Sequence, residues 1–166
     1  MSKVKEISKS YRYWSNGCGD LFTPDVETRE DIDVRDLPVQ LQELFNTLWT
    51  DGYGFRCYLT ELDGQYGIAY EDEYSQHTAE SYGITYEEYL DKAKVFAELI
   101  AVKFPQFTVM YEKDFCEWSD GTKDSIIVVF MPYGVSKKDF DAVNAFMEKN
   151  HPVHEIANEI TKGAAT

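Results

Sequence analysis

The sequence predicts an α+β domain of two layers, in which an antiparallel sheet of two hairpins packs against three to four helices. Three observations support this prediction: a hairpin turn at Asp63-Gly64, a long amphipathic helix that begins after Thr85, and an apolar run over 125–131 typical of a central strand. About four strands are expected, and a fifth from the N-terminal residues is left open. At 166 residues, the chain has the length of one compact domain.

Residues 14–36 lack a clean hydrophobic period and are rich in acids and turn formers, so 1–36 are predicted to form an irregular N-terminal surface segment. A strand within 4–14 is the alternative. Residues 37–49 follow with leucines at helical spacing, and Asp36 is placed to cap this helix. We expect the folded core to span 37–150, in the order helix, hairpin, helix, hairpin, helix.

The first hairpin is predicted from two β-type runs, 55–62 and 65–70, on either side of Asp63-Gly64. Asp-Gly between such runs is the strongest short-range signal for a hairpin. Alternate residues of the second run share one face. We expect this strand to end at Tyr70 and residues 71–84 to form an exposed acidic connection.

A long helix is predicted to begin after Thr85, because Thr85 and Glu88 form a capping-box pattern. One stripe of this helix is apolar and should face the sheet: Tyr86, Tyr89, Leu90, Ala93, Phe96, Ala97, Ile100 and Phe104. Val95, Leu99 and Val102 form a second apolar line on the far side. We expect the chain's own C-terminal or N-terminal segment to cover this line, with a homodimer contact as the alternative.

The C-terminal part of the chain predicts a second hairpin followed by two helices. Residues 107–115 alternate in polarity, and 125–131 are largely β-branched and aromatic, as in a strand buried on both faces. Ser136 begins a helix that Pro152 interrupts. A short helix and a tail are expected over 152–166.

Composition limits the class of protein. Aromatic residues make up 15% of the chain, whereas disordered acidic proteins have few. No apolar run approaches the ~20 residues that a membrane span needs, and the N-terminal lysines are not followed by the apolar stretch of a secretory signal. The three cysteines are odd in number and widely spaced, which predicts reduced thiols in a cytoplasmic protein.

The formal net charge of −14 argues against direct binding to nucleic acid or to an anionic membrane, because phosphates are bound by Lys and Arg. The charge is unevenly distributed: residues 13–91 carry eighteen acids against three arginines, which gives −15, while 1–12 sum to +3 and 92–166 to −2. Such asymmetry indicates a positively charged partner. It is also compatible with a purely solubilising role.

No motif predicts a catalytic, cofactor or metal site. His151 and His154 are three residues apart, but a proline between them separates two helices, so we interpret them as polar residues at a helix junction. Asp31, Asp33 and Asp36 have a spacing that allows weak binding of a hard cation, without the glycine and glutamate of an EF-hand loop. We therefore expect neither an enzyme nor a resident cofactor or metal.

The acidic, tyrosine-rich surface is the candidate binding site. Tyrosines supply contact area and carboxylates steer the encounter with a Lys/Arg-rich partner. The predicted contacts are Asp31, Asp33, Asp36, Glu71, Asp72, Glu73, Glu80, Glu87 and Asp91, with Tyr74 and Tyr82 as apolar anchors. Several tyrosines of this region also fall on core-facing stripes, so a structural role for them is left open.

These features predict a small cytoplasmic binding module that engages a basic surface of another protein. In composition, the chain is similar to the small acidic inhibitors that phages and plasmids use against restriction or CRISPR systems. This resemblance implies an inhibitor that mimics nucleic acid, with carboxylates in place of phosphates. One alternative is a small enzyme or ligand-binding domain with a pocket between sheet and helices. Another is a structural subunit with Val95, Leu99 and Val102 at an oligomer seam.

Overall fold

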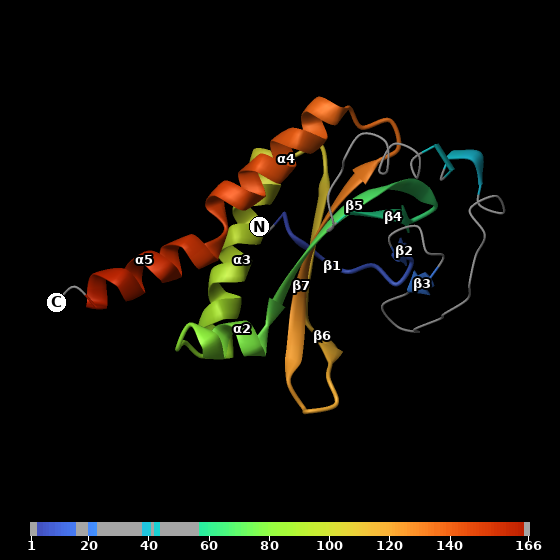
Figure 1. Ribbon diagram of the computed structural model, residues 1–166. Coiled ribbons are helices and arrows are strands. Elements are labelled where there is room, and N and C mark those ends of the chain that lie inside the picture. The colour runs from blue at the N-terminus through green and yellow to red at the C-terminus, as the bar shows by residue number, and fades with distance from the viewer. Residues whose placement is uncertain (1–2, 16–19, 23–37, 41, 44–56, 165–166) are drawn as a thin grey trace.

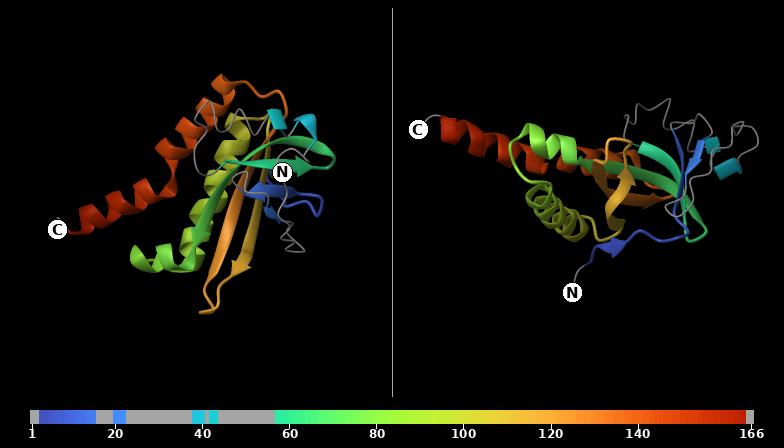
Figure 2. Two further views of the ribbon diagram at one scale, coloured as in Figure 1. Left: turned by 45° about the vertical axis from the view of Figure 1, so that its right-hand side comes forward. Right: turned by 90° about the horizontal axis from the view of Figure 1, so that it is seen from below.

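The protein is a mixed sheet with helices packed on one face, the α+β fold that the sequence predicts (Figures 1 and 2). In the computed structural model, the described residues are 3–15, 20–22, 38–40, 42–43 and 57–164. Among these residues the sheet has seven strands in the order β1-β6-β7-β5-β4-β2-β3. Neighbouring strands are antiparallel, apart from the parallel pair of β1 and β6.

The strands are β1 (Lys5–Glu6), β2 (Arg12–Ser15), β3 (Asp20–Phe22), β4 (Cys57–Leu62), β5 (Gln65–Ser75), β6 (Thr108–Glu117) and β7 (Lys123–Pro132). The helices are α2 (Gln76–Ser81), α3 (Tyr86–Lys103), α4 (Lys137–Asn150) and α5 (Pro152–Ala164). In the described part of the chain, no helix combines the length and the apolar character required to cross a membrane.

The predicted hairpin around Asp63-Gly64 is confirmed as β4 and β5. Both turn residues have positive φ, 50° for Asp63 and 82° for Gly64, as a two-residue turn between right-twisted strands requires. The second predicted hairpin is confirmed as β6 and β7. The apolar residues of β7 are buried on both faces of the sheet, since Ile127, Val129 and Met131 lie in one hydrophobic core and Ile126, Val128 and Phe130 in another.

The strand β5 does not end at Tyr70, so the exposed connection predicted over 71–84 is wrong. Residues 71–75 continue β5 and pair with β7 as far as Ser75, which lies opposite Asp124. The helix α2 follows at once. The physical reason is the length of β7, whose backbone groups need a partner along the whole strand. The backbone of residues 71–75 supplies that partner, although three of these residues are acidic.

The two predicted helices α3 and α4 cover one face of the sheet. The stripe predicted for α3 is confirmed: Tyr89, Leu90, Ala93, Phe96, Ala97, Ile100 and Phe104 are buried, and Tyr86 is half-buried. These side chains share one core with Ile127, Val129 and Met131 of β7 and with Phe140, Val143 and Met147 of α4. As predicted, Ser136 caps α4, with its hydroxyl accepting the N–H of Asp139.

The N-terminus of α3 is capped as predicted, with the Thr85 hydroxyl accepting the N–H of Glu88 at 3.1 Å. Replacing Thr85 with Ala leaves this N–H without its side-chain acceptor. We expect a loss of about 1 kcal/mol in the free energy of unfolding, measured by urea denaturation. Thr161→Ala is the matched control, because Thr161 lies inside α5 and donates to the Ala157 carbonyl. Equal unfolding midpoints for the two variants would contradict the capping role.

The second apolar line on α3 is not covered by the described residues, contrary to the expectation that a terminal segment packs over it. Val95, Leu99 and Val102 are 63%, 51% and 63% exposed. The helix α5 meets α3 one turn earlier, where Lys92 pairs with Glu155 at 3.3 Å. From there α5 projects away from the rest of the molecule (Figures 1 and 2), and it extends to Ala164, beyond the short helix expected.

The other face of the sheet carries a second, smaller core, which consists of Tyr11, Leu62, Ala69, Met110, Ile126, Val128 and Phe130. In the segment predicted to be irregular, β2 and β3 pair as a hairpin, and β1 and β2 supply the strands that the sequence left open. Of the helix predicted over 37–49, residues 39–40 and 42–43 are helical. The rest of that helix lies outside the described residues.

Candidate functional site

The structure divides the predicted contact residues into three groups. Glu73, Glu80, Glu87 and Asp91 are exposed, as predicted, and Tyr82 is half-buried against the main core. Glu71, Asp72 and Tyr74 are buried, with exposed fractions of 4%, 3% and 0%, so their predicted position on the surface is wrong. Asp31, Asp33 and Asp36 lie outside the described residues.

The burial follows from the alternation of side chains along β5. Ile68, Tyr70 and Tyr74 pack into the core beneath the helices, and Asp72 has the same parity. Glu71 has the opposite parity and faces the second core, where the Tyr11 hydroxyl donates to its Oε1 at 2.5 Å. One strand therefore buries a carboxyl group on each face of the sheet.

Asp72 is paired with a histidine from the helical layer. Nε2 of His151 lies 3.1 Å from Oδ2 of Asp72, and both side chains are largely buried. The ring of His151 packs against two aromatic side chains. It stacks on Tyr74 with ring centroids 5.4 Å apart, and it forms an edge contact with Phe96 at a centroid distance of 5.7 Å. It occupies the junction of α4 and α5, where Pro152 begins the second helix.

The second ring nitrogen of His151 is also engaged. Nδ1 accepts the backbone N–H of Val153 at 3.2 Å and so caps the start of α5. With Nδ1 as acceptor, a neutral imidazole carries its proton on Nε2, the nitrogen that lies 3.1 Å from Oδ2 of Asp72. Both ring nitrogens of His151 therefore have a contact, one with Asp72 on β5 and one with the first turn of α5.

A pocket of about 450 Å³ opens next to this pair. It is bounded by β5, α2, α3 and the junction of α4 with α5, and it is lined by Tyr70, Asp72, Glu73, Thr78, Tyr89, Met147, Glu148, His151, Val153 and His154. We call it the acidic pocket, because three of these residues are carboxylates and none is Lys or Arg. Buried Asp72 lies among its walls, and Glu73 and Glu148 are exposed.

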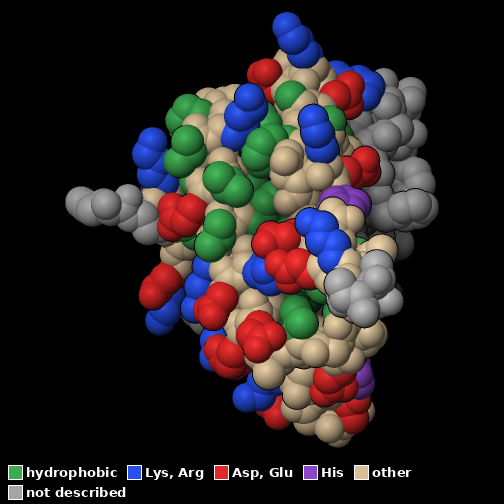
Figure 3. All heavy atoms as spheres, turned by 90° about the vertical axis from the view of Figure 1, so that its left-hand side faces the viewer, with side chains coloured by type: hydrophobic (Ala, Val, Ile, Leu, Met, Phe, Trp, Pro, Cys, Tyr) green, Lys and Arg blue, Asp and Glu red, His purple; other side chains and the backbone are tan. Residues whose placement is uncertain are grey.

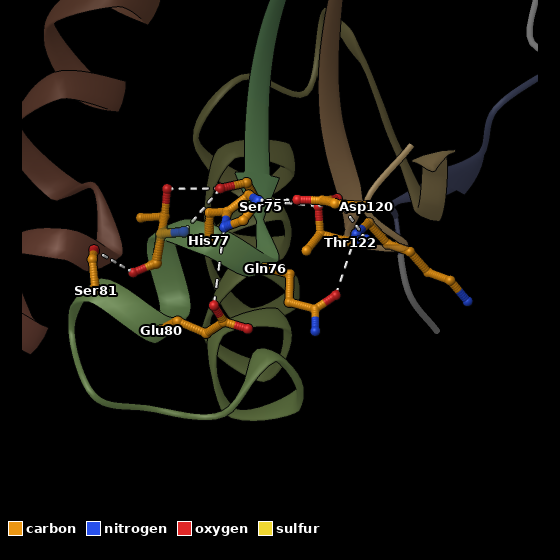
Figure 4. A network of polar contacts seen from close by, with 9 residues as sticks. Ser75, Gln76, His77, Glu80, Ser81, Asp120 and Thr122 are labelled. Atoms are coloured by element: carbon orange, nitrogen blue, oxygen red, sulfur yellow. Dashed lines mark hydrogen bonds and ion pairs between the residues drawn. The ribbon is translucent and has the colours of Figure 1, made fainter. Parts of the chain in front are cut away.

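The helix α2, which supplies Thr78 to the acidic pocket, is fixed to the turn between β6 and β7 (Figure 4). Ser75 caps this helix by accepting the N–H of Thr78 at 2.9 Å. Nε2 of His77 lies 2.9 Å from Oδ2 of Asp120. The other carboxylate oxygen, Oδ1, accepts hydrogen bonds from the hydroxyl and N–H of Thr122. These Thr122 hydrogen bonds, with a smaller contribution from His77, lower the pKa of Asp120 to about 2.

The exposed predicted residues do not all contribute to the acidic pocket. Glu73 lines it. Glu87 is occupied by an ion pair with Lys113 at 2.8 Å, and the hydrogen bond from Lys113 lowers the pKa of Glu87. Asp91 borders a different groove, between α3 and α5. On the face that carries the helices, acidic side chains are more frequent in the lower half and hydrophobic ones gather above them (Figure 3).

The two histidines of the 151–155 motif have separate contacts. His151 contacts Asp72, and Nε2 of His154 lies 2.7 Å from the backbone carbonyl of Glu148. Among the described residues, no group of three His, Cys, Asp or Glu side chains is arranged to hold a metal ion.

Sequence reasoning missed Glu148, His151 and His154 as lining residues of one pocket. The period-2 pattern that runs from Ile68 through Asp72 to Tyr74 was the signal available for extending β5 and for placing Asp72 inside.

Comparisons of the chain with protein-family models, with curated proteins and with solved structures find no match.

Proposed function

We propose that the protein binds a basic partner protein and that the acidic pocket receives a cationic side chain of that partner, Arg or Lys. One observation carries the proposal: a pocket of about 450 Å³ with three carboxylates, two tyrosines and no Lys or Arg in its walls. A guanidinium or ammonium group pairs with carboxylates through charge-assisted hydrogen bonds, and its aliphatic stem packs on apolar and aromatic side chains.

The charge of the whole chain supports this proposal. A net charge of −14 raises the rate of encounter with a basic surface and makes the complex sensitive to salt. The more specific form, an inhibitor that mimics nucleic acid, requires carboxylates displayed along a groove-shaped surface. Of the predicted residues, Glu73, Glu80 and Asp91 are exposed and lie outside the Glu87–Lys113 ion pair, and competition between this protein and nucleic acid for one partner tests this form directly.

A second candidate function is the binding of a small cationic ligand, because the volume of the pocket falls within the ~300–1,000 Å³ typical of ligand sites. In this case the Asp72–His151 pair positions a carboxylate for the ligand. Titrations with an arginine-rich peptide and with arginine amide separate the two functions. If arginine amide alone binds as tightly as an arginine-rich peptide, the ligand-binding function takes precedence.

The experiment is a fluorescence-anisotropy titration of a labelled arginine-rich peptide with the wild-type protein and with the double variant Glu73→Gln, Glu148→Gln. Both residues are exposed at the pocket, so the substitutions remove charge without disturbing the core. We expect the dissociation constant for the peptide to rise about tenfold at low salt and the difference to shrink as salt is added.

The matched control is Glu6→Gln with Glu117→Gln, which removes the same charge from exposed positions on β1 and β6. We expect this control to change the dissociation constant less than about twofold, because distant exposed charges are screened. Equal weakening by the two double variants would show that net charge alone drives binding, and the assignment of the pocket would then be wrong.

A further inference from the structure

Two apolar helix faces of this chain have no covering element among the described residues. The first is the α3 strip, which consists of Val95, Leu99 and Val102 on one side of the helix and is 51–63% exposed. Side chains at this spacing form a continuous ridge along a helix. Hydrophobic side chains gather above the acidic ones on this side of the molecule (Figure 3).

The second uncovered face belongs to the outer half of α5. The apolar stripe of this helix runs through Val153, Ile156 and Ile160 at helical spacing. Ile156 is 1% exposed because it packs against the body of the protein, but Ile160 is 47% exposed. The stripe thus continues past the surface that it packs on, into the part of α5 that projects from the molecule (Figures 1 and 2).

The α3 strip adjoins a groove at the start of α5, and residues of opposite charge neighbour the two apolar faces in the sequence. The groove holds about 290 Å³ and is lined by Val95 and Leu99 from α3 and by Pro152 and Glu155 from α5, among others. Lys103 directly follows Val102, and Glu159 directly precedes Ile160. Lys103 and Glu159 are exposed and, within the described part of the chain, take part in no ion pair.

We infer that two copies of this chain form a symmetric dimer in which the outer half of α5 of each copy packs on the α3 strip of the other. A two-fold axis makes this contact twice, because each copy supplies one α5 and receives the other. The helix α5 has thirteen residues, so its outer half is about 10 Å long, about the width of the helix that it crosses. Glu159 of each copy then lies against Lys103 of the other.

This dimer responds to salt in the opposite direction from the basic-partner complex. Two chains that each carry −14 repel one another, so added salt should strengthen a contact made by apolar side chains. A complex with a basic partner should weaken. The dimer does not rest on the proposed function, and the pocket variants of Glu73 and Glu148 are expected to leave it unchanged.

The first test is sedimentation equilibrium over a range of protein concentrations, in which the dimer has twice the chain mass of 19.2 kDa. Leu99→Glu and Ile160→Glu should each shift the protein to the monomer, with the circular dichroism spectrum unchanged because both residues are exposed. Val39→Glu is the matched control: it puts the same charge on a residue that is 68% exposed elsewhere, and the dimer should persist.

The second test exchanges the charges. Glu159→Lys and Lys103→Glu should each weaken dimerisation about tenfold, since each places like charges together, and the double variant should recover most of the loss. A wild-type protein that stays monomeric at every concentration overturns the proposal. So does a dimer that survives both Leu99→Glu and Ile160→Glu. Failure of the double charge exchange to recover overturns the packing of α5 on α3.

Discussion

The variant Glu71→Gln is expected to be more stable than the wild-type protein at pH 9, by on the order of 5 kcal/mol, and equally stable at pH 4. Burial raises the pKa of Glu71 to about 8 from an ordinary value of 4.5, against the hydrogen bond from Tyr11, which lowers it. The folded protein therefore keeps a proton on this carboxyl group that the unfolded chain loses. Glutamine has nearly the same shape as the protonated acid and carries no charge at any pH.

The sign of this effect follows from proton linkage. Between pH 4.5 and 8 the folded state binds more protons at Glu71 than the unfolded state, so the stability of the wild type falls as pH rises. The fall is about 1.4 kcal/mol per pH unit and is complete above the pKa of the folded state. In Glu71→Gln this contribution is absent.

Urea denaturation at pH 4, 7 and 9 checks the prediction, with Glu117→Gln as the control. Glu117 is exposed at the end of β6 and is not one of the groups that shift the pKa of Glu71, so the same change there should leave the pH profile parallel to that of the wild type. If the free energies of unfolding of Glu71→Gln and of the wild type change in parallel with pH, Glu71 does not keep a proton in the folded protein.

The variant Gly67→Ala is expected to destabilise the protein by about 3 kcal/mol or more, because the folded structure has no space for the methyl group of an alanine at position 67. A Cβ atom at Gly67 would lie 2.3 Å from the backbone carbonyl oxygen of Met131 and 2.8 Å from Cε2 of Phe130. Gly67 pairs with Pro132 at the end of the β5–β7 ladder, where Phe130 packs in the second core. The ring can shift, but the carbonyl belongs to a central strand and cannot.

Gly163→Ala is the matched control for Gly67, because a Cβ there has open space around it inside α5. This change should be neutral or slightly stabilising, since alanine favours helix more than glycine does. The double variant Gly67→Ala, Phe130→Leu removes the ring but not the carbonyl, and we expect it to remain destabilised. Urea unfolding midpoints measure all three, and a wild-type midpoint for Gly67→Ala contradicts the close packing.

The elements that the sequence predicts well are those specified by neighbouring residues. The turn at Asp63-Gly64 needs two positive φ angles, and these two residues accept them. The start of α3 needs an acceptor for a free N–H, and Thr85 supplies it three residues from Glu88. The buried stripe of α3 follows from the helical period alone.

The end of β5 is marked in the sequence only by the alternation of Ile68, Tyr70 and Tyr74, which Glu71 and Asp72 obscure. Glu71 and Asp72 have the polarity of a surface loop, and what keeps them inside lies far off in the sequence: Tyr11 on one face and His151 on the other. A local pattern contains no record of such partners, since burial of a carboxyl group depends on the pairing available in the folded state. The acidic pocket was missed for the same reason, because its walls come from four separate elements.

The wrong expectation that a terminal segment covers the α3 strip has a different cause. The sequence identifies Val95, Leu99 and Val102 as an apolar line on α3. An amphipathic pattern does not show whether the segment that covers such a line belongs to the same chain or to another copy. In the structure, β1 pairs with β6 at the sheet edge and α5 points outward, so neither terminal element lies over Leu99.

The position of β1 in the sheet has a consequence for the order of folding. Lys5 pairs with Met110, 105 residues later in the chain, and β2 pairs with β4 across a shorter separation of 49 residues, from Arg12 to Glu61. Closing such long loops is slow compared with forming the β6–β7 and β4–β5 hairpins. During synthesis β1 therefore has no partner until the β6–β7 hairpin has emerged, and from then until β1 docks the edge of β6 is open to pairing with another chain.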